Sequence, residues 1–307
     1  MSGPWFSFTL TDFSYSFLSI LFEGIPFILF GTLLSGVIDQ FLPARVMTRL
    51  IPRNPAAGIC VSALMGLVFP ICECGIVPVI RRLVAKGLPV SSAVAYMLAA
   101  PIVNPITAIS TYAAFRGQGP EEITTLRLSL GFFVAALAGF AVLNLPLRSV
   151  LKKSVLDQCG DVDSHSLTPH APFTRRLASA MHSGTRDFLD VAVYFVLGVA
   201  VTSLFGTSIN QEIFLPLALN ETLAIPAMMT LAGLLSLCSS SDAFIAATFV
   251  SFPAVAKLAF LVIGPMVDLK LLFVYSLVFT RRFVAGLAVG LFLLVALLAL
   301  RLGIVFQ

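Results

Sequence analysis

The chain alternates between long apolar stretches and short stretches of polar or helix-breaking residues. An α-helix needs about 20 apolar residues to cross the core of a bilayer. The stretches that come close to this length are Phe17–Ile38, Leu126–Leu147, Phe188–Leu204 and Phe283–Leu302. Shorter apolar segments between them end at glycine, proline, asparagine or aspartate instead of continuing. The pattern predicts an all-α polytopic membrane protein of about eight transmembrane segments, of which some are broken or re-entrant.

The composition agrees with a membrane protein and argues against several other classes. Hydrophobic residues make up 58% of the 307 residues and charged residues 11%, whereas a soluble domain is about 25% charged. The net charge of +4 lies in the predicted loops, so it does not indicate a nucleic-acid partner. Five cysteines, mostly in apolar segments, do not suggest a disulfide framework. The sequence has no P-loop, HExxH or GxSxG motif, so we expect no enzyme activity, cofactor or metal site.

Landmarks of the first half return in the second half in the same order. Each pair is separated by 163 to 167 residues, and the pairs are Glu23 and Asp190, Gly31 and Gly198, Cys72 and Cys238, Pro101 and Pro265, and Tyr112 and Tyr275. Many transporters are built from two such halves. We therefore expect one membrane repeat at 1–147 and a second at 187–307. The polar stretch 148–186, which holds all three histidines, is expected to be a cytoplasmic linker loop, with a histidine metal site as the alternative.

The distribution of lysine and arginine favours opposite orientations for the two repeats. Cytoplasmic loops of membrane proteins carry more basic residues than loops on the other side. If the segments around Cys72 and Cys238 enter the membrane and leave on the same side, 14 basic residues lie inside and four outside. Full crossings throughout would leave 11 inside and 7 outside. The first arrangement makes the repeats inverted and puts Arg81 and Arg82 at the cytoplasmic boundary.

The sequence FPICECGIVP, at 69–78, combines two thiols and a glutamate with two helix-breaking residues. Non-helical backbone at membrane depth is stable only where protein covers it or where it lines a cavity. Gly75 and Pro78 predict such a break, and PIVNP, at 101–105, predicts another. Pro78 suits the first turn of a new helix, whose free backbone N–H groups can face a ligand. We expect the tip of a re-entrant loop to present thiols and amides to a cavity.

Three cysteines are candidates for a common binding site. Cys72 and Cys74 are two residues apart, so an extended segment would direct both sulfur atoms to one side. Cys238 would face them from the second repeat, where it is followed by Ser239 and Ser240. Converging thiols suit soft, thiophilic ligands. The alternative is that these cysteines pack as small apolar groups, as buried free cysteines often do.

Several acidic residues lie in segments that should be within the membrane, where a charge is costly and therefore suggests a function. The candidates for proton coupling are Glu23, Glu73, Asp190 and Asp242. The candidates for the substrate site, besides the cysteines and serines, are Glu73, Gly75, Asn104, Asp242 and Asp268. Pairing with a basic residue is the alternative role. Lys270 is not expected to pair with Asp268, because residues two apart do not face each other on a regular helix.

Several of these segments resemble the predicted permease family that includes bacterial organoarsenical efflux permeases. The resemblance spans nearly the whole chain and rests on PICECGIVP, GLPVSSAVAYMLAAPIVNPI and LCSSSDAFIAATF. The residues that match the family pattern are Cys72, Cys74, Gly75, Pro78, Pro101, Asn104, Pro105, Cys238, Asp242 and Ala243.

The resemblance implies an export permease of the bacterial inner (cytoplasmic) membrane. In arsenic-exporting members the thiols are thought to engage trivalent methylated or aromatic arsenicals, which agrees with the preference of thiols for soft ligands. The family pattern has a small residue between the two cysteines, where this chain has Glu73. An acidic residue at this position would repel anions, favour a cation or add proton coupling.

These observations favour a secondary permease that exports a small thiophilic or polar solute through a central site of cysteines and carboxylates. Other functions fit parts of the pattern. A passive channel could use the same re-entrant loops as a filter, a membrane thiol oxidoreductase would cycle Cys72 and Cys74 through oxidation, and a scaffold subunit would transport nothing itself. The expected partners are a small-molecule substrate, the lipid bilayer and, as an open alternative, a second copy in a homodimer.

Overall fold

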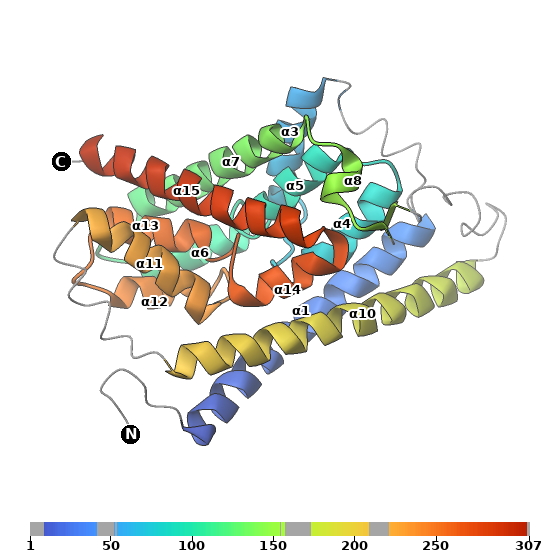
Figure 1. The fold of residues 1–307 in the computed structure, drawn as a ribbon, viewed down its shortest axis with the longest axis horizontal. Coiled ribbons are helices and arrows are strands. Elements are labelled where there is room, and N and C mark those ends of the chain that lie inside the picture. Colours follow the sequence, from blue (N-terminus) through green and yellow to red (C-terminus); the bar gives the residue numbers. More distant parts are fainter. Residues whose placement is uncertain are drawn as a thin grey trace.

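A computed structural model describes residues 9–41, 52, 54–153, 155–156, 173–208 and 221–305. Within these ranges the regular structure is helical, and the β pairing consists of one isolated bridge between Leu151 and Phe279. The all-α class expected from the sequence is therefore confirmed. Figure 1 shows the helices running mostly along the long direction of the molecule.

Four helices in the described ranges are long and apolar enough to cross a membrane. They are α1 (Leu10–Phe41), α7 (Pro120–Val142), α10 (Phe173–Ser208) and α15 (Arg281–Val305). Each corresponds to one of the spans expected from the sequence, so those four predictions are confirmed. Helix α7 begins six residues earlier than expected, because Gly119 has a left-handed backbone (φ 74°) and Pro120 takes the first helical position, which proline favours.

The remaining helices are short. In the first half they are α3 (Pro55–Leu64), the 3-10 helix η1 (Met65–Leu67), α4 (Ile76–Ala85), α5 (Val90–Ala99) and α6 (Pro105–Ala114). In the second half they are α11 (Glu221–Leu235), α12 (Asp242–Thr248), α13 (Ala254–Ile263) and α14 (Leu269–Val278). A helix of ten residues is about 15 Å long, which is half of a hydrocarbon core of about 30 Å. Such helices can cross a membrane in series or enter and return in pairs.

The polar stretch at 148–186 is described only in part. Its beginning belongs to the short helix α8 (Leu147–Val150), and residues 173–186 form the first part of α10 rather than a loop. The start of α10 packs on the end of α1, where the rings of Phe41 and Phe173 are 5.7 Å apart. His165 and His170, on which the hypothesis of a histidine metal site depends, lie outside the described residues.

Helices α1 and α10, the first long helix of each half, lie side by side (Figure 1). Their backbones come close because small residues stand at the contacts. A Cβ atom on Gly36 would lie 2.1 Å from the carbonyl oxygen of Ala180, and one on Gly24 would lie 2.2 Å from the ring of Phe195. Small residues at helix–helix contacts are typical of membrane proteins, where close packing drives association.

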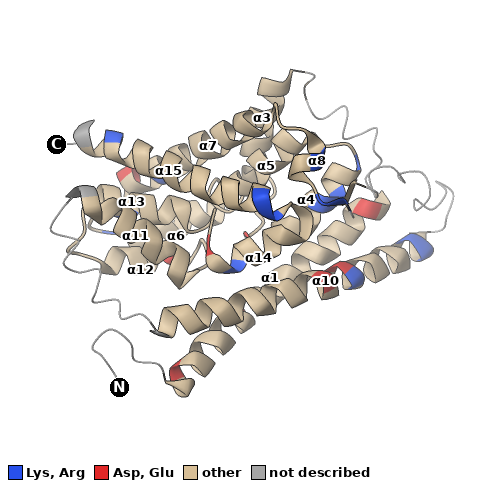
Figure 2. Ribbon diagram, in the orientation of Figure 1, with Lys and Arg blue, Asp and Glu red and all other residues tan. Residues whose placement is uncertain are grey.

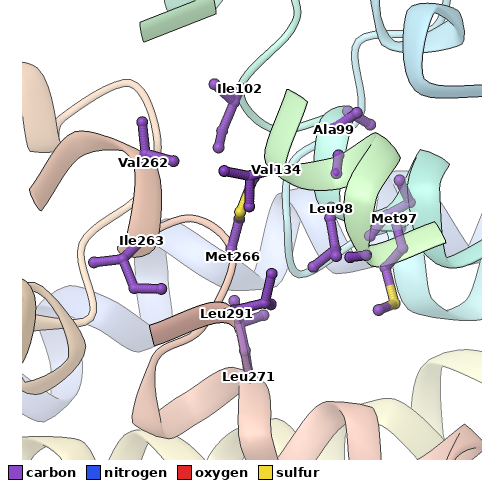
Figure 3. Close-up of a cluster of buried hydrophobic side chains, with 14 of the residues drawn as sticks. Met97, Leu98, Ala99, Ile102, Val134, Val262, Ile263, Met266, Leu271 and Leu291 are labelled. Carbon is purple, nitrogen blue, oxygen red and sulfur yellow. The ribbon is translucent and has the colours of Figure 1, made fainter. Parts of the chain in front are cut away.

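The two halves share one hydrophobic core. Figure 3 shows part of it, with side chains from α5, α7, α13, α14 and α15 packed together. Met97 of α5 and Val134 of α7 are fully buried, and so are Val262 of α13 and Leu271 of α14. The broken segments of both halves are therefore held by common packing in the middle of the molecule.

Basic residues gather at one end of the helix bundle, around α4, α8 and the beginning of α15 (Figure 2). We call this end the basic end and define it by residues of these helices and of the C-cap of α4, namely Arg81, Arg82, Lys86, Arg148, Arg281 and Arg282. Helices α4 and α14 finish near it. The turn after α6 meets the last turn of α12 at the opposite end, where the side chain of Gln118 donates to the carbonyl oxygen of Ala247 and accepts from Lys257.

Candidate functional site

The break expected around Cys72 is present. Turns and irregular backbone separate η1 from α4, and the N–H of Ile76, the first residue of α4, donates to the carbonyl oxygen of Cys72 at 3.1 Å. Helix α1 touches this loop directly, because a Cβ atom on Gly31 would lie 2.3 Å from the carbonyl oxygen of Gly75. Two glycines in contact thus hold the loop against α1 without an intervening side chain.

The segment around Cys238 has the same local structure. The N–H of Asp242, the first residue of α12, donates to the carbonyl oxygen of Cys238 at 2.9 Å. Cys72 and Cys238 therefore occupy equivalent places, each four residues before the helix that follows the break.

The other two breaks are also alike. The side chain of Asn104 accepts from the N–H of Thr107 at 2.8 Å, and the side chain of Asp268 accepts from the N–H of Leu271 at 2.7 Å. Both are N-cap residues with extended backbone, before α6 and α14 respectively. An N-cap oxygen satisfies an N–H group that has no partner within the helix. This explains how a new helix can begin in the protein interior at these two positions.

A cavity of about 370 Å³ lies between α1 and the broken segments. The thiols of Cys72 and Cys238 line it, and the rings of Phe27 and Phe30 line its α1 side. Its polar lining residues are Asn104, Thr107, Ser239 and Ser240. Among the described residues, no aspartate, glutamate, lysine or arginine contributes to this wall. The cavity wall is therefore neutral.

Unlike Cys72 and Cys238, Cys74 does not line this cavity. It is 5% exposed and borders a small void together with Cys72 and Cys238. The extended segment that would direct the sulfur atoms of Cys72 and Cys74 to one side is not present, because residues 73–75 form a turn.

Glu73 belongs to a buried charge cluster behind the cavity wall. Its Oε1 lies 3.7 Å from Nζ of Lys270, which also lies 3.3 Å from Oδ2 of Asp268 and donates to the carbonyl oxygen of Ser236 at 2.6 Å. Each of the three charged residues is at most 3% exposed. The cluster joins the Cys72 loop of the first half to the Cys238 segment of the second half. Oε2 of Glu73 is buried without a hydrogen-bond donor among the described residues.

Lys270 and Asp268 do pair, against the expectation from their spacing. The expectation assumed that both residues lie on a regular helix. Asp268 is instead the N-cap of α14 and precedes the helix, so its side chain can turn toward the first helical turn, where Lys270 lies.

Asp242 forms a second buried ion pair, with an arginine from the first half. Nη2 of Arg127 lies 2.7 Å from Oδ2 of Asp242 and also donates to the carbonyl oxygen of Ser239 at 3.1 Å. Nη1 donates to Oγ1 of Thr111 at 2.8 Å. Arg127 is 0% exposed and Asp242 is 2% exposed. Because breaking a buried ion pair costs several kcal/mol, this contact holds α7 to the Cys238 segment.

Arg127 and Lys270 were not among the predicted site residues. Arg127 is the second residue of its expected span, Leu126–Leu147, and is one of the four basic residues expected outside. The signal that could have revealed it is GQGPEE, at 117–122, since a proline after glycine marks an earlier helix start. Lys270 could have been identified because it is a lysine within an apolar segment, where a charged residue usually has a partner or a function.

Glu23 and Asp190 occupy different environments. Glu23 accepts from the hydroxyl of Ser241 at 3.3 Å and borders the small void beside the thiols. Asp190 lies near the basic end, where its carboxylate is 3.5 Å from Nη1 of Arg81 and 49% exposed. The structure therefore brings Glu23 to the thiols and leaves Asp190 in a different cluster.

Ion pairs at the basic end join α4 to α1 and α10. Arg82 donates two hydrogen bonds to Asp187, each of 3.1 Å, and lies 3.5 Å from Asp39. Asp187 also accepts from Ser35 at 3.0 Å and is 2% exposed. Lys86 donates to the carbonyl oxygen of Asp39. We call Asp39, Arg81, Arg82, Asp187 and Asp190 the closing cluster.

The family model described as "Predicted permease" matches residues 9–306. The UPF0718 protein YcgR of Bacillus subtilis (strain 168) is 37% identical over 271 residues, which cover 87% of this chain and 89% of the relative. A "Putative two-component membrane permease complex subunit" of Streptococcus mutans serotype c (strain ATCC 700610 / UA159) is 33% identical over 269 residues, which cover 87% of each chain. No solved structure matches the chain. Because the family model covers both cysteine segments and all four long helices, the chain belongs to this predicted permease family.

Proposed function

We propose that the protein is a secondary permease that exports a small thiophilic solute, such as a trivalent organoarsenical, across a bacterial inner membrane. The observation that carries the proposal is the cavity of about 370 Å³ in which Cys72 of one half and Cys238 of the other share a neutral wall. A soft ligand atom would bind both thiols, while the rest of the solute would contact the cavity lining.

The lining favours an uncharged solute with an apolar or aromatic part. Phe27 and Phe30 offer aromatic faces, and Asn104 and Ser240 offer neutral hydrogen-bonding groups. A charged solute would lose its hydration on entering the cavity and would find no opposite charge in the wall. Burying an unpaired charge in apolar surroundings costs much free energy. Neutral arsenicals with methyl or phenyl groups meet these conditions, whereas oxyanions do not.

Two inverted repeats explain the paired breaks. The helix series α1, α3 to α7 and the series α10 to α15 contain equivalent elements in the same order. Cys72 corresponds to Cys238, and Asn104 to Asp268, at matching positions before their helices. In our proposal the basic end faces the cytoplasm, and about eight segments enter the membrane, including those that return or cross in series.

Transport would proceed by movement of the α1–α10 pair relative to the broken helices. In the described structure α1 packs along α4, and α10 packs along α14, whereas their contacts with α6 and α12 are sparse. Gly31 meets Gly75 at the start of α4, and a Cβ atom on Gly198 would lie 2.9 Å from the backbone of Lys270 at the start of α14. In the opposite state the two repeats would exchange conformations. Helix α1 would then pack on α6, and α10 would pack on α12. The cavity would then open toward the basic end, as alternating access requires.

The closing cluster indicates which side of the protein would be closed in the described conformation. Its ion pairs tie α4 to α1 and α10 at the basic end. The corresponding faces of α6 and α12 are uncovered, with Ile106 and Ile109 exposed by 57% and 70% and Phe244 by 51%. The described state would therefore be closed toward the cytoplasm, and loss of the closing cluster would accompany the opposite state.

Carboxylates in both halves would couple the movement to protons. Oε2 of Glu73 and Oδ1 of Asp242 have no hydrogen-bond donor among the described residues, so each could accept a proton. Glu23 would receive protons near the thiols, and Asp190 would do so near the basic end. Protonation of Glu73 would weaken its pairing with Lys270, which joins the two halves.

The test is binding and efflux of a trivalent aromatic arsenical, phenylarsine oxide, by the purified protein in proteoliposomes. Cys72→Ser should weaken binding by at least about tenfold, because one of two soft ligand atoms is lost. Cys60→Ser is the matched control, since Cys60 is a free cysteine of α3 that does not line the cavity. Equal binding by the wild type and Cys72→Ser would overturn the thiol site. Current without dependence on a proton gradient would indicate a channel, and a mixed disulfide trapped on Cys72 would indicate an oxidoreductase.

A further inference from the structure

An open groove runs along the outer surface between α7 and α15. Its volume is about 590 Å³, and its walls are apolar except near one end, where Ser149 and Arg282 stand. Gly286 and Gly290 form part of the floor, and a Cβ atom on either glycine would have no atom within 4 Å. The groove is therefore unfilled by the described part of the chain.

Basic side chains surround the polar end of this groove. Helix α8 is fixed beside the start of α15, because the N–H of Thr280 donates to the carbonyl oxygen of Val150 at 2.9 Å and its hydroxyl donates to Ser149 at 2.6 Å. Arg148 of α8 is thereby held close to the start of α15, which carries Arg281 and Arg282. All three arginines are exposed, and none forms an ion pair within the described ranges.

The length of the groove fits one leaflet of a bilayer. Its apolar part on α15 extends from Phe283 to Leu294, which corresponds to about 17 Å at the rise of an α-helix. Half of a hydrocarbon core measures about 15 Å. An acyl chain of one leaflet would fill the groove, whereas a transmembrane helix would continue beyond it.

We propose that the groove between α7 and α15 binds an anionic phospholipid of the cytoplasmic leaflet, with an acyl chain along Gly286 and Gly290 and the phosphate at Arg148, Arg281 and Arg282. Unpaired guanidinium groups at the headgroup level complement a negative lipid, and arginine binds phosphate oxygens through two N–H groups at once. The inference goes beyond solute transport and does not depend on it. Only the name of the leaflet depends on the proposed topology.

The test is native mass spectrometry of the purified full chain with phosphatidylglycerol and phosphatidylcholine of identical acyl chains. The wild type should retain phosphatidylglycerol more tightly. Each arginine near an anionic surface contributes about fivefold in affinity, so the double variant Arg281→Gln with Arg282→Gln should bind phosphatidylglycerol about 25-fold more weakly. Its affinity for phosphatidylcholine, which has a phosphate but no net charge, should fall much less. Arg301→Gln, at the opposite end of α15, is the matched control and should behave as the wild type.

A second variant tests the groove itself. Gly290→Leu places a side chain in open space, so it should fold normally and weaken binding of both lipids by blocking the acyl chain. Equal phosphatidylglycerol binding by the double variant and the wild type would overturn the proposal. The proposal would also fail if Gly290→Leu converted a dimer into a monomer without changing lipid binding, because the groove would then be an interface between two copies.

Discussion

Replacement of Arg127 by methionine tests the buried connection between the two halves. The guanidinium group of Arg127 is 0% exposed and contacts acceptors on three residues: Thr111 at 2.8 Å, the carbonyl oxygen of Ser239 at 3.1 Å and Asp242 at 2.7 Å. The variant would leave the Asp242 carboxylate buried without its cation. Removal of one partner from a buried ion pair costs about 3–5 kcal/mol, so we expect a decrease of this size in the free energy of unfolding.

The double variant Arg127→Met with Asp242→Leu separates the ion pair from simple loss of packing. Neither charge remains buried, and such replacements are often neutral, so the double variant should recover most of the stability lost by Arg127→Met. Reversible unfolding in mixed detergent micelles would give the free energies for a double-mutant cycle. If the double variant is as unstable as the sum of the two single variants, the contact contributes no coupling and the reasoning is wrong.

Further predictions concern the contacts of α1 and the closing cluster. Gly31→Val should prevent the contact with the Cys72 loop, because even a Cβ atom would lie 2.3 Å from the carbonyl oxygen of Gly75, and a fall in thermal stability far larger than that of Gly286→Val would show it. Asp187→Asn removes the bidentate partner of Arg82, and hydrogen bonds to charged groups contribute about 1.5–3 kcal/mol. Labelling of Cys72 by an impermeant thiol reagent from the basic end should then rise at least about tenfold. An unchanged labelling rate would contradict the proposed closure.

The breaks in the helices could be predicted because their causes are local. Glycine and proline interrupt a helix through their own backbone properties, and Asn104 and Asp268 can cap the next helix with their own side chains. The same local reasoning did not reveal the turn at residues 73–75, where Gly75 contacts α1. It also failed for Lys270, whose pairing with Asp268 depends on where α14 begins.

By itself the sequence determined that the chain is helical, that four segments can span a membrane, and that several shorter helices are separated by breaks. These properties follow from the length of apolar segments and from the cost of unsatisfied backbone groups in lipid. Only the tertiary structure decided which charges pair, since Arg127 and Asp242, or Lys270 and Glu73, are far apart in the chain and meet across the two halves. The cavity wall is neutral because these buried charged side chains pair with each other behind it and do not line it. A local pattern of residues contains no information about contacts between residues that are distant in the sequence, because these contacts depend on how all the helices pack together.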